Sequence, residues 1–460
     1  MSIRSLLSCP IKVLTRDAYL LFLSRFVRLF AYGSLSVVLV FYLIGLGLRE
    51  AQVGILLTLT LVGDTAISLY LTTRADRMGR RRMLIVGSIL MAAAGLAVAC
   101  TRNFVFLLIA GTIGVISPSG NEVGPFLSIE QAALAHVVSE QSRTEVFAWY
   151  TLAGSAATAI GALFAGAITG VLQKTTVAPV AAYRVVVVLY AVLGVFLAAL
   201  FLRLSPAVEV HSPRDESALP TTLKRFFGIG QSHRVVAKLS SLFALDSFAG
   251  GFVVQSFAAY WFYLRFGIHP TALGVIFFWA NIFAGISALL AARLSARWGL
   301  VNTMVLTHLP SNILLILVPL MPNLSLAVLV LLLRFSISQM DVPTRQSYVM
   351  AVVRSEERSA AAGITGVART TGAAISPLFV GYMFARSSWI NVPFFLAGAL
   401  KILYDLLLYK EFVGSSPSRN GIKGCRRAIG GVDSTGESFS GGFQVSGIDF
   451  LLIRRCPRFP

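Results

Sequence analysis

Long apolar runs separated by short charged segments constrain this chain more than any other feature of its sequence. Runs of about 18 or more mostly apolar residues recur along the 460 residues, and each can cross roughly 30 Å of hydrocarbon as a helix. Only 13% of the residues are charged, about half the share found in a typical soluble protein. The sequence therefore predicts an all-α polytopic membrane protein, because a β-barrel would show short segments of alternating polarity instead.

We expect twelve transmembrane helices in two six-helix bundles. The predicted spans are 18–47, 52–73, 83–100, 104–132, 145–170, 182–202, 236–264, 271–293, 301–320, 324–350, 359–384 and 389–411. Residues 1–16 are expected to form a cytoplasmic N-terminus, 17–202 the N-terminal bundle and 236–412 the C-terminal bundle. The polar segment 203–235 is predicted to link the bundles in the cytoplasm, and the Gly- and Ser-rich segment 413–460 to form a disordered cytoplasmic tail.

An internal repeat supports this division into two pseudo-symmetric bundles. Arg143 and Gly166 match Arg358 and Gly381 at one constant offset, together with several apolar positions between them. A weaker match pairs Arg77-Met78-Gly79 with Arg297-Trp298-Gly299. Parallel repeats of six helices are the internal symmetry of a large class of membrane transporters.

The charge distribution predicts the orientation of the chain in the membrane. The net charge of +19 would favour nucleic-acid binding in a soluble chain, but here the basic residues lie between apolar runs. Membrane orientation and contact with anionic lipids therefore explain the charge, and no nucleic-acid partner is expected. Most basic residues lie on the side shared by both termini, so both termini are predicted to be cytoplasmic.

The remaining composition indicates neither a metal site nor a bound cofactor. The four cysteines form no spaced pair, and the five histidines are scattered along the chain. No phosphate-cradling or Ser/His/Asp pattern occurs near a predicted site, which excludes an ATP-driven pump.

The densest charge of the N-terminal bundle lies in the short loop 74–82 between the second and third spans. Its residues Asp76-Arg77-Met78-Gly79-Arg80-Arg81 resemble the loop 2–3 signature of the major facilitator superfamily, although Thr72 replaces the usual glycine. The resemblance covers roughly residues 15–412. It implies a non-enzymatic carrier of two rocking bundles that moves a small solute by alternating access.

The same resemblance implies a gate at the inner side of the membrane. Its expected members are Asp76, Arg77, Gly79, Arg80 and Arg81, with Glu130, Arg143 and Arg358 as partners. By this interpretation Glu130 pairs with the basic loop, for example with Arg80. The alternative is that Glu130 is an interfacial acid in contact with water.

Polar residues inside the spans are costly in lipid, so they mark candidate cavity residues. The segment 118–125 holds two prolines and two glycines at membrane depth and predicts a broken helix beside a cavity. Asn121 and Glu122 within it are the first candidates for substrate or proton binding. Arg28 in the first span is expected to contact either an acidic partner such as Glu122 or the substrate itself.

Further candidates lie in the second span and in the C-terminal bundle. Asp64 and Asp246 are single acids in apolar surroundings, which suits either a proton carrier or an acid that bridges helices. Arg334, Asp341 and Arg369 are predicted to join an ion-pair network with Arg345. Such a network either rearranges during transport or remains static.

The sequence thus predicts a secondary active transporter for a small solute, with protons as a candidate coupling ion and a monomer as the expected state. The alternative from another class is a non-transporting membrane receptor or scaffold with the same fold. An intramembrane enzyme would need a catalytic histidine or metal cluster at depth, for which His308 alone is poor support.

Overall fold

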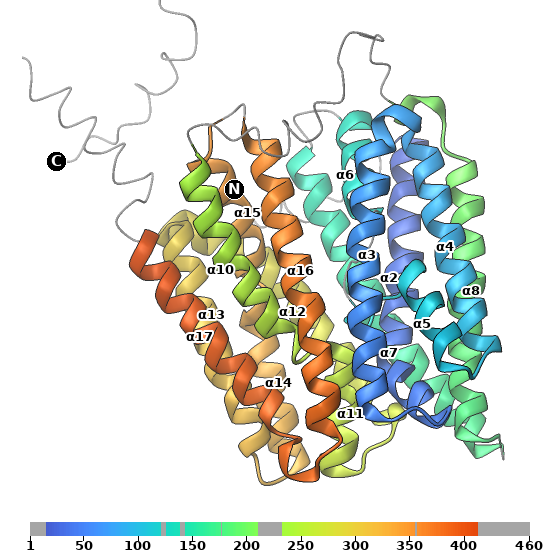
Figure 1. Cartoon of the computed structure of the whole chain (residues 1–460). Helices are drawn as coiled ribbons and strands as arrows, with labels where there is room; N and C mark the ends of the chain where they lie inside the picture. The colour runs from blue at the N-terminus through green and yellow to red at the C-terminus, as the bar shows by residue number, and fades with distance from the viewer. Residues whose placement is uncertain are drawn as a thin grey trace, which may run out of the picture. The chain divides into compact units, whose positions relative to one another are not determined.

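A computed structural model describes residues 15–120, 126–138, 143–175, 177–209, 232–354 and 357–412. Over these residues the protein is helical, and residues 15–412 belong to a single compact unit. Figure 1 shows helices α2 to α8 gathered on one side and α10 to α17 on the other, which matches the predicted division into two bundles.

Five long helices and one broken span, formed by α5 and α6, make up the N-terminal half. Its helices are α2 (Arg16–Gly45), α3 (Glu50–Met78), α4 (Arg80–Cys100), α5 (Phe104–Ile113), α6 (Phe126–Val137), α7 (Arg143–Lys174) and α8 (Pro179–Leu202), followed by the short 3-10 helix η2 (Pro206–Val208). Thr15 accepts a hydrogen bond from the backbone N–H of Ala18, which caps the start of α2.

The C-terminal half repeats this arrangement with more interruptions. Its elements are α10 (His233–Gly251), α11 (Gln255–Phe266), α12 (Pro270–Trp298), α13 (Leu300–Leu317), η3 (Val318–Leu320), α14 (Leu324–Ser338), α15 (Asp341–Val352), α16 (Arg358–Phe384), η5 (Ser387–Trp389) and α17 (Val392–Phe412). Ten stretches of the described residues are long and apolar enough to cross a bilayer. The two predicted spans outside these ten are 104–132, which is broken, and 359–384, which corresponds to α16.

The prediction of a broken fourth span is confirmed. Helix α5 ends at Ile113, residues 114–120 are not helical, and a new helix begins at Phe126. Pro118 cannot donate a helical hydrogen bond, and Gly120 adopts a φ of +68°, which a residue with a Cβ rarely tolerates. The tenth span is also divided, because α14 ends at Ser338 and α15 begins at Asp341.

Matched residues at matched places confirm the internal repeat in three dimensions. Gly79 joins α3 to α4 with a φ of +102°, and Gly299 joins α12 to α13 with a φ of +82°. Asn103 caps α5 through its side-chain oxygen, and Asn323 caps α14 in the same way. The two halves therefore share local geometry at equivalent turns and caps.

The two halves touch most closely at one end of the bundle, where α3 begins and α16 ends; we call it the closed end. A Cβ added to Gly54 of α3 would lie 2.9 Å from the Cα of Gly381 in α16. In the equivalent pair, a Cβ added to Gly166 of α7 would lie 3.0 Å from the Cα of Gly274 in α12. Only residues without a side chain allow backbones to approach this closely.

Polar contacts reinforce the closed end. The Tyr260 hydroxyl of α11 donates to Glu50 Oε1 of α3 at 3.1 Å, and Gln255 Nε2 of α11 donates to Ser36 Oγ of α2 at 2.8 Å. Ser256 Oγ donates to the Pro118 carbonyl at 2.5 Å, so the broken segment of the N-terminal half rests on α11.

The Gly381→Val substitution is expected to destabilise this arrangement of the halves. Its added side chain would collide with the α3 backbone, since an added Cβ already lies 2.5 Å from the Glu50 carbonyl oxygen. We expect a loss of about 1–3 kcal/mol of stability, measured as a lower thermal unfolding midpoint of the purified protein.

Gly363→Val is the matched control, because Gly363 lies in the same helix and a Cβ there meets nothing within 4 Å. The two variants share the same change in helix propensity. Equal unfolding midpoints for both would show that the glycine contact does not hold the halves together.

Candidate functional site

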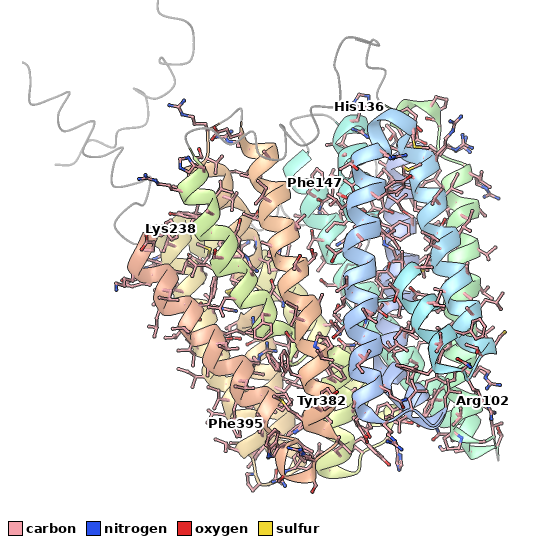
Figure 2. All side chains as sticks on the ribbon, viewed as in Figure 1. Arg102, His136, Phe147, Lys238, Tyr382 and Phe395 are labelled. Atoms are coloured by element: carbon pink, nitrogen blue, oxygen red, sulfur yellow. The ribbon has the colours of Figure 1, made fainter. Side chains whose placement is uncertain are left out.

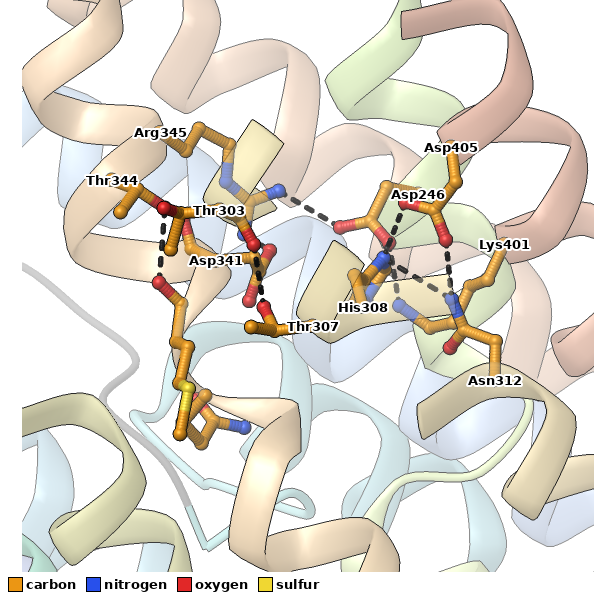
Figure 3. Close-up of polar contacts among 12 residues, drawn as sticks. Asp246, Thr303, Thr307, His308, Asn312, Asp341, Thr344, Arg345, Lys401 and Asp405 are labelled. Atoms are coloured by element: carbon orange, nitrogen blue, oxygen red, sulfur yellow. Dashed lines mark hydrogen bonds and ion pairs between the residues drawn. The ribbon is translucent and has the colours of Figure 1, made fainter. Parts of the chain in front are cut away.

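A cluster of buried charged side chains lies inside the C-terminal half. Four helices contribute to it: Asp246 from α10, His308 and Asn312 from α13, Asp341 and Arg345 from α15, and Lys401 and Asp405 from α17. These seven residues form what we call the C-half cluster, and Figure 3 shows them converging from separate helices. All seven side chains are buried, whereas Figure 2 shows that other side chains of these helices, such as Lys238 of α10, point to the outside.

Asp246 is the hub of the C-half cluster. Its Oδ2 accepts a hydrogen bond from Arg345 Nη1 at 2.8 Å, and its Oδ1 accepts one from Lys401 Nζ at 2.6 Å (Figure 3). His308 Nε2 lies 3.8 Å from the same Oδ1 atom. A carboxylate with two cationic partners is strongly favoured in its charged form, because an isolated buried charge would cost several kcal/mol.

His308 lies between two carboxylates from different helices. Its Nδ1 lies 2.8 Å from Asp405 Oδ1, and its other ring nitrogen faces Asp246. Asn312 Nδ2 donates to Asp405 Oδ2 at 2.9 Å and so holds the orientation of that carboxylate. An imidazole in this position can carry a proton between the two acids, because its two nitrogens reach different partners.

Arg345 extends the C-half cluster along α15. Its Nη2 lies 3.0 Å from Asp341 Oδ2, one helical turn earlier, while its Nη1 holds Asp246. The guanidinium carbon also lies 5.2 Å from the ring centroid of Phe243. Asp341 is the first residue of α15, where a negative charge is favoured by the helix dipole.

Two arginines of the predicted network do not join it. Arg334 of α14 and Arg369 of α16 make no hydrogen bond or ion pair with any residue that the structure describes, and the buried Nε of each has no partner. Both side chains are partly exposed. The charges of Asp246 and Asp341 act favourably on both guanidinium groups, although neither carboxylate is a hydrogen-bond or ion-pair partner of them.

The N-terminal half contains a separate buried ion pair. Arg28 of α2 donates to both oxygens of Glu130 in α6, at 2.6 and 2.8 Å, and neither side chain is exposed. Ser24 Oγ donates to Glu130 at 2.8 Å, and the hydroxyl of Tyr150 in α7 also donates to it. This bidentate pair joins three helices of the half and leaves no oxygen of Glu130 without a donor.

Both sequence-based interpretations of Glu130 are therefore wrong. Glu130 contacts neither Arg80 nor water, because α6 begins anew at Phe126 and continues about two turns past Glu130. Arg80 instead donates through Nη1 to the Ala132 carbonyl at 3.2 Å. Arg28 has an acidic partner as expected, but that partner is Glu130; Glu122 and Asn121 lie outside the described residues.

The remaining gate candidates lie at the end opposite the closed end. The backbone N–H groups of Arg80 and Arg81 donate to the carboxylate of Glu209, at 2.7 and 3.1 Å. Gly79 supplies the turn before α4, and Arg358 begins α16 with an exposed side chain. The side chains of Asp76, Arg77 and Arg143 lie outside the described part of the structure.

Asp64 is buried in α3 and lies apart from the C-half cluster, in the other half of the protein. Its charge acts on Tyr190 of α8. The structure therefore places Asp64 among the helices of the N-terminal half rather than beside Asp246.

Sequence reasoning missed four members of the C-half cluster and one capping residue. Lys401 and Asp405 stand four residues apart in the last apolar span, and this pair of charges at membrane depth is a signal that could have found them. His308 and Asn312 have the same spacing in α13. Glu209 lay in a polar linker, where an acid carries no comparable signal.

Comparisons with known proteins give the family. A model of the Major Facilitator Superfamily matches residues 21–338 and 239–424. The chain is 32% identical over 429 residues to the "Uncharacterized membrane protein YJR124C" of Saccharomyces cerevisiae, a match that covers 88% of this chain and 95% of that protein.

Solved structures of transporters share the fold at low sequence identity. The nucleoside transporter NupG has a TM-score of 0.67 at 13% identity, covering 86% of this chain and 99% of NupG. A bacterial homologue of the human lysosomal transporter Spinster, in an inward-facing and occupied conformation, has a TM-score of 0.66 at 16% identity, covering 89% and 99%. A D-xylose–proton symporter has a TM-score of 0.64 at 15% identity, covering 85% and 97%.

Removing one partner of the Arg28–Glu130 pair is expected to destabilise the protein strongly. In Glu130→Leu, Arg28 would remain fully buried without its carboxylate, at a cost of about 3–5 kcal/mol. The double variant Arg28→Met/Glu130→Leu removes both charges and should recover most of that loss. Thermal unfolding of the purified variants measures this, and a double variant as unstable as Glu130→Leu alone would contradict it.

Proposed function

Because this chain belongs to the Major Facilitator Superfamily, we propose that it is a secondary active transporter that moves a small solute across a membrane by alternating access. The single observation that carries the proposal is the C-half cluster. A buried set of charges shared by four helices is costly in a membrane protein and marks a path for ions or solutes. The broken fourth and tenth spans support it, because interrupted helices in equivalent positions of the two halves accompany transporter binding sites.

In this proposal the two halves rock against each other, and the C-half cluster lies within the C-terminal half. The glycine contacts Gly54–Gly381 and Gly166–Gly274 hold the closed end together. With both termini in the cytoplasm, as the basic residues favour, the closed end faces away from the cytoplasm. The opposite end, where Gly79 joins α3 to α4, then carries the inner gate, with Arg80 and Arg81 positioned by Glu209.

We assign proton coupling to the His308–Asp405 pair. Asp246 is paired with two cations, whereas Asp405 has only neutral Asn312 and the titratable His308 as hydrogen-bond partners among the described residues. Protonation of either member changes the charge next to Asp246. It therefore changes the electrostatic interactions that hold α10, α13 and α17 together. We expect the protein to work as a monomer surrounded by lipid, with protons and one small solute as its ligands.

Lys401→Met is expected to abolish transport. The substitution leaves Asp246 with a single hydrogen-bonded cation and removes one of the ion pairs between α17 and α10. The solute is first identified by comparing the metabolite contents of cells that lack and cells that overproduce the protein. Its flux is then measured in proteoliposomes, where we expect at least a tenfold loss for Lys401→Met.

Lys410→Met is the matched control, because Lys410 lies on the same helix with an exposed side chain. Flux at the wild-type level in both variants would remove the C-half cluster from the transport mechanism. Binding of the solute without flux in the wild type would favour the receptor interpretation instead.

Asp405→Asn tests proton coupling separately from transport. The variant cannot change its charge at this position, so it should no longer accumulate solute when a pH gradient is imposed. It should still exchange labelled for unlabelled solute, because exchange needs no net proton movement. Both rates are measured in the same proteoliposomes, and accumulation that persists in Asp405→Asn would remove this pair as the proton carrier.

A further inference from the structure

Arg334 and Arg369 stand out because neither has an anionic partner among the residues that the structure describes. They come from different helices, α14 and α16, and each presents a buried Nε that meets no acceptor. Arg345, by contrast, is held by two carboxylates. Of the two unpaired arginines, Arg334 lies near an aromatic ring, with its guanidinium carbon 5.0 Å from the ring centroid of Phe335.

Among the residues that the structure describes, the charges of this region do not balance without a further anion. The acids are Asp246, Asp341 and Asp405, and the permanent cations are Arg334, Arg345, Arg369 and Lys401. The three acids already have Arg345, Lys401 and His308 as ion-pair or hydrogen-bond partners. The excess positive charge therefore falls on Arg334 and Arg369, where the low dielectric makes it expensive.

The position of Arg369 makes this excess more costly. The like charge of Arg345 acts unfavourably on Arg369. Arg345 already has Asp246 and Asp341 as partners, so Arg369 is the guanidinium group of this pair that lacks a counter-charge among the described residues. Since both Arg334 and Arg369 are partly exposed, an anion can reach them without displacing an existing ion pair.

We propose that Arg334 and Arg369 together bind the anionic group of the transported solute, so that the substrate class is an organic anion with a carboxylate or phosphate group. This inference rests on the proposed transport function and names the substrate for the same site. A guanidinium group offers several donors in a planar fork, which fits the two or three oxygens of such a group. Bound to both arginines, the anion supplies the missing counter-charge and links α14 to α16.

The first test needs no ligand. If Arg369 has no counter-charge until the substrate binds, removing its charge relieves electrostatic repulsion in the substrate-free protein. Arg369→Gln should then have an unfolding midpoint equal to or higher than that of the wild type. Arg345→Gln is the comparison, because it strips a structural partner from Asp246 and Asp341 and should lower the unfolding midpoint. A loss of stability in Arg369→Gln equal to that in Arg345→Gln would assign Arg369 a structural role and overturn the proposal.

The second test measures binding to the purified full-length protein at constant ionic strength. The anionic probes are succinate, benzoate, glucose 6-phosphate and inorganic phosphate, and the neutral counterparts are succinamide, benzamide and glucose. At least one anion should raise the unfolding midpoint of the wild type while its neutral counterpart does not. In Arg334→Gln and Arg369→Gln the apparent affinity for that anion should fall by about tenfold or more.

Two further variants sharpen this result. Arg334→Lys keeps the charge but loses the planar fork, so it should bind the anion more weakly than the wild type and more tightly than Arg334→Gln. Arg386→Gln removes an exposed arginine at the closed end, next to Trp389, and should bind like the wild type. Equal effects of anions and neutral counterparts, or full anion binding by both Gln variants, would overturn the proposal.

The outcomes separate this inference from the proposed function. Anion binding that depends on both arginines, without flux in proteoliposomes, would support the anion site and contradict transport. Flux of a neutral solute that is unchanged in Arg334→Gln and Arg369→Gln would support transport and contradict the anion site.

Discussion

The pairing of Asp246 with Arg345 and Lys401 is the interaction on which the C-terminal half depends. A carboxylate at this depth is tolerated only if cations accompany it, and the cations come from α15 and α17. His308 and Asp405 then bring α13 into the same set of contacts. Four helices are thus held by charges that lipid cannot solvate, so their relative positions are tied to the protonation and occupancy of one small region.

The N-terminal half stabilises its buried charges by a different arrangement. Arg28 and Glu130 form a bidentate pair with no exposed surface, completed by hydroxyl groups of Ser24 and Tyr150. The pair is balanced in charge and has no titratable histidine as partner in the described contacts. The buried ion pair of the N-terminal half is therefore neutral, whereas the described charges of the C-half cluster, together with Arg334 and Arg369, have a positive sum. This asymmetry supports the proposal that the chemistry of transport lies in the C-terminal half.

Much of the architecture could be predicted from the sequence, because span length and basic loops follow directly from the properties of the bilayer. The break near Pro118 and Gly120 was also predictable, since both residues interrupt a helix for known steric reasons. The partner of Glu130 was not, because the register of α6 depends on where the helix restarts after that break. The lack of an acidic partner for Arg334 and Arg369 among the described residues was not predictable either. The sequence shows which residues are charged, but not that Arg345 and Lys401 pair with the nearby acids.

The two glycine crossings at the closed end have a consequence for how that end separates. Gly54 and Gly274 occupy equivalent places at the starts of α3 and α12, and Gly166 and Gly381 are equivalent positions of the sequence repeat. The crossings are therefore related by the approximate two-fold axis of the molecule. A rigid rotation of one half relative to the other, about a direction perpendicular to that axis, lengthens the backbone distance at both crossings together. Neither crossing can therefore separate while the other stays in contact. In the proposed transport cycle, separation of this end would therefore be cooperative, and intermediates with only one of the two crossings separated would be sparsely populated.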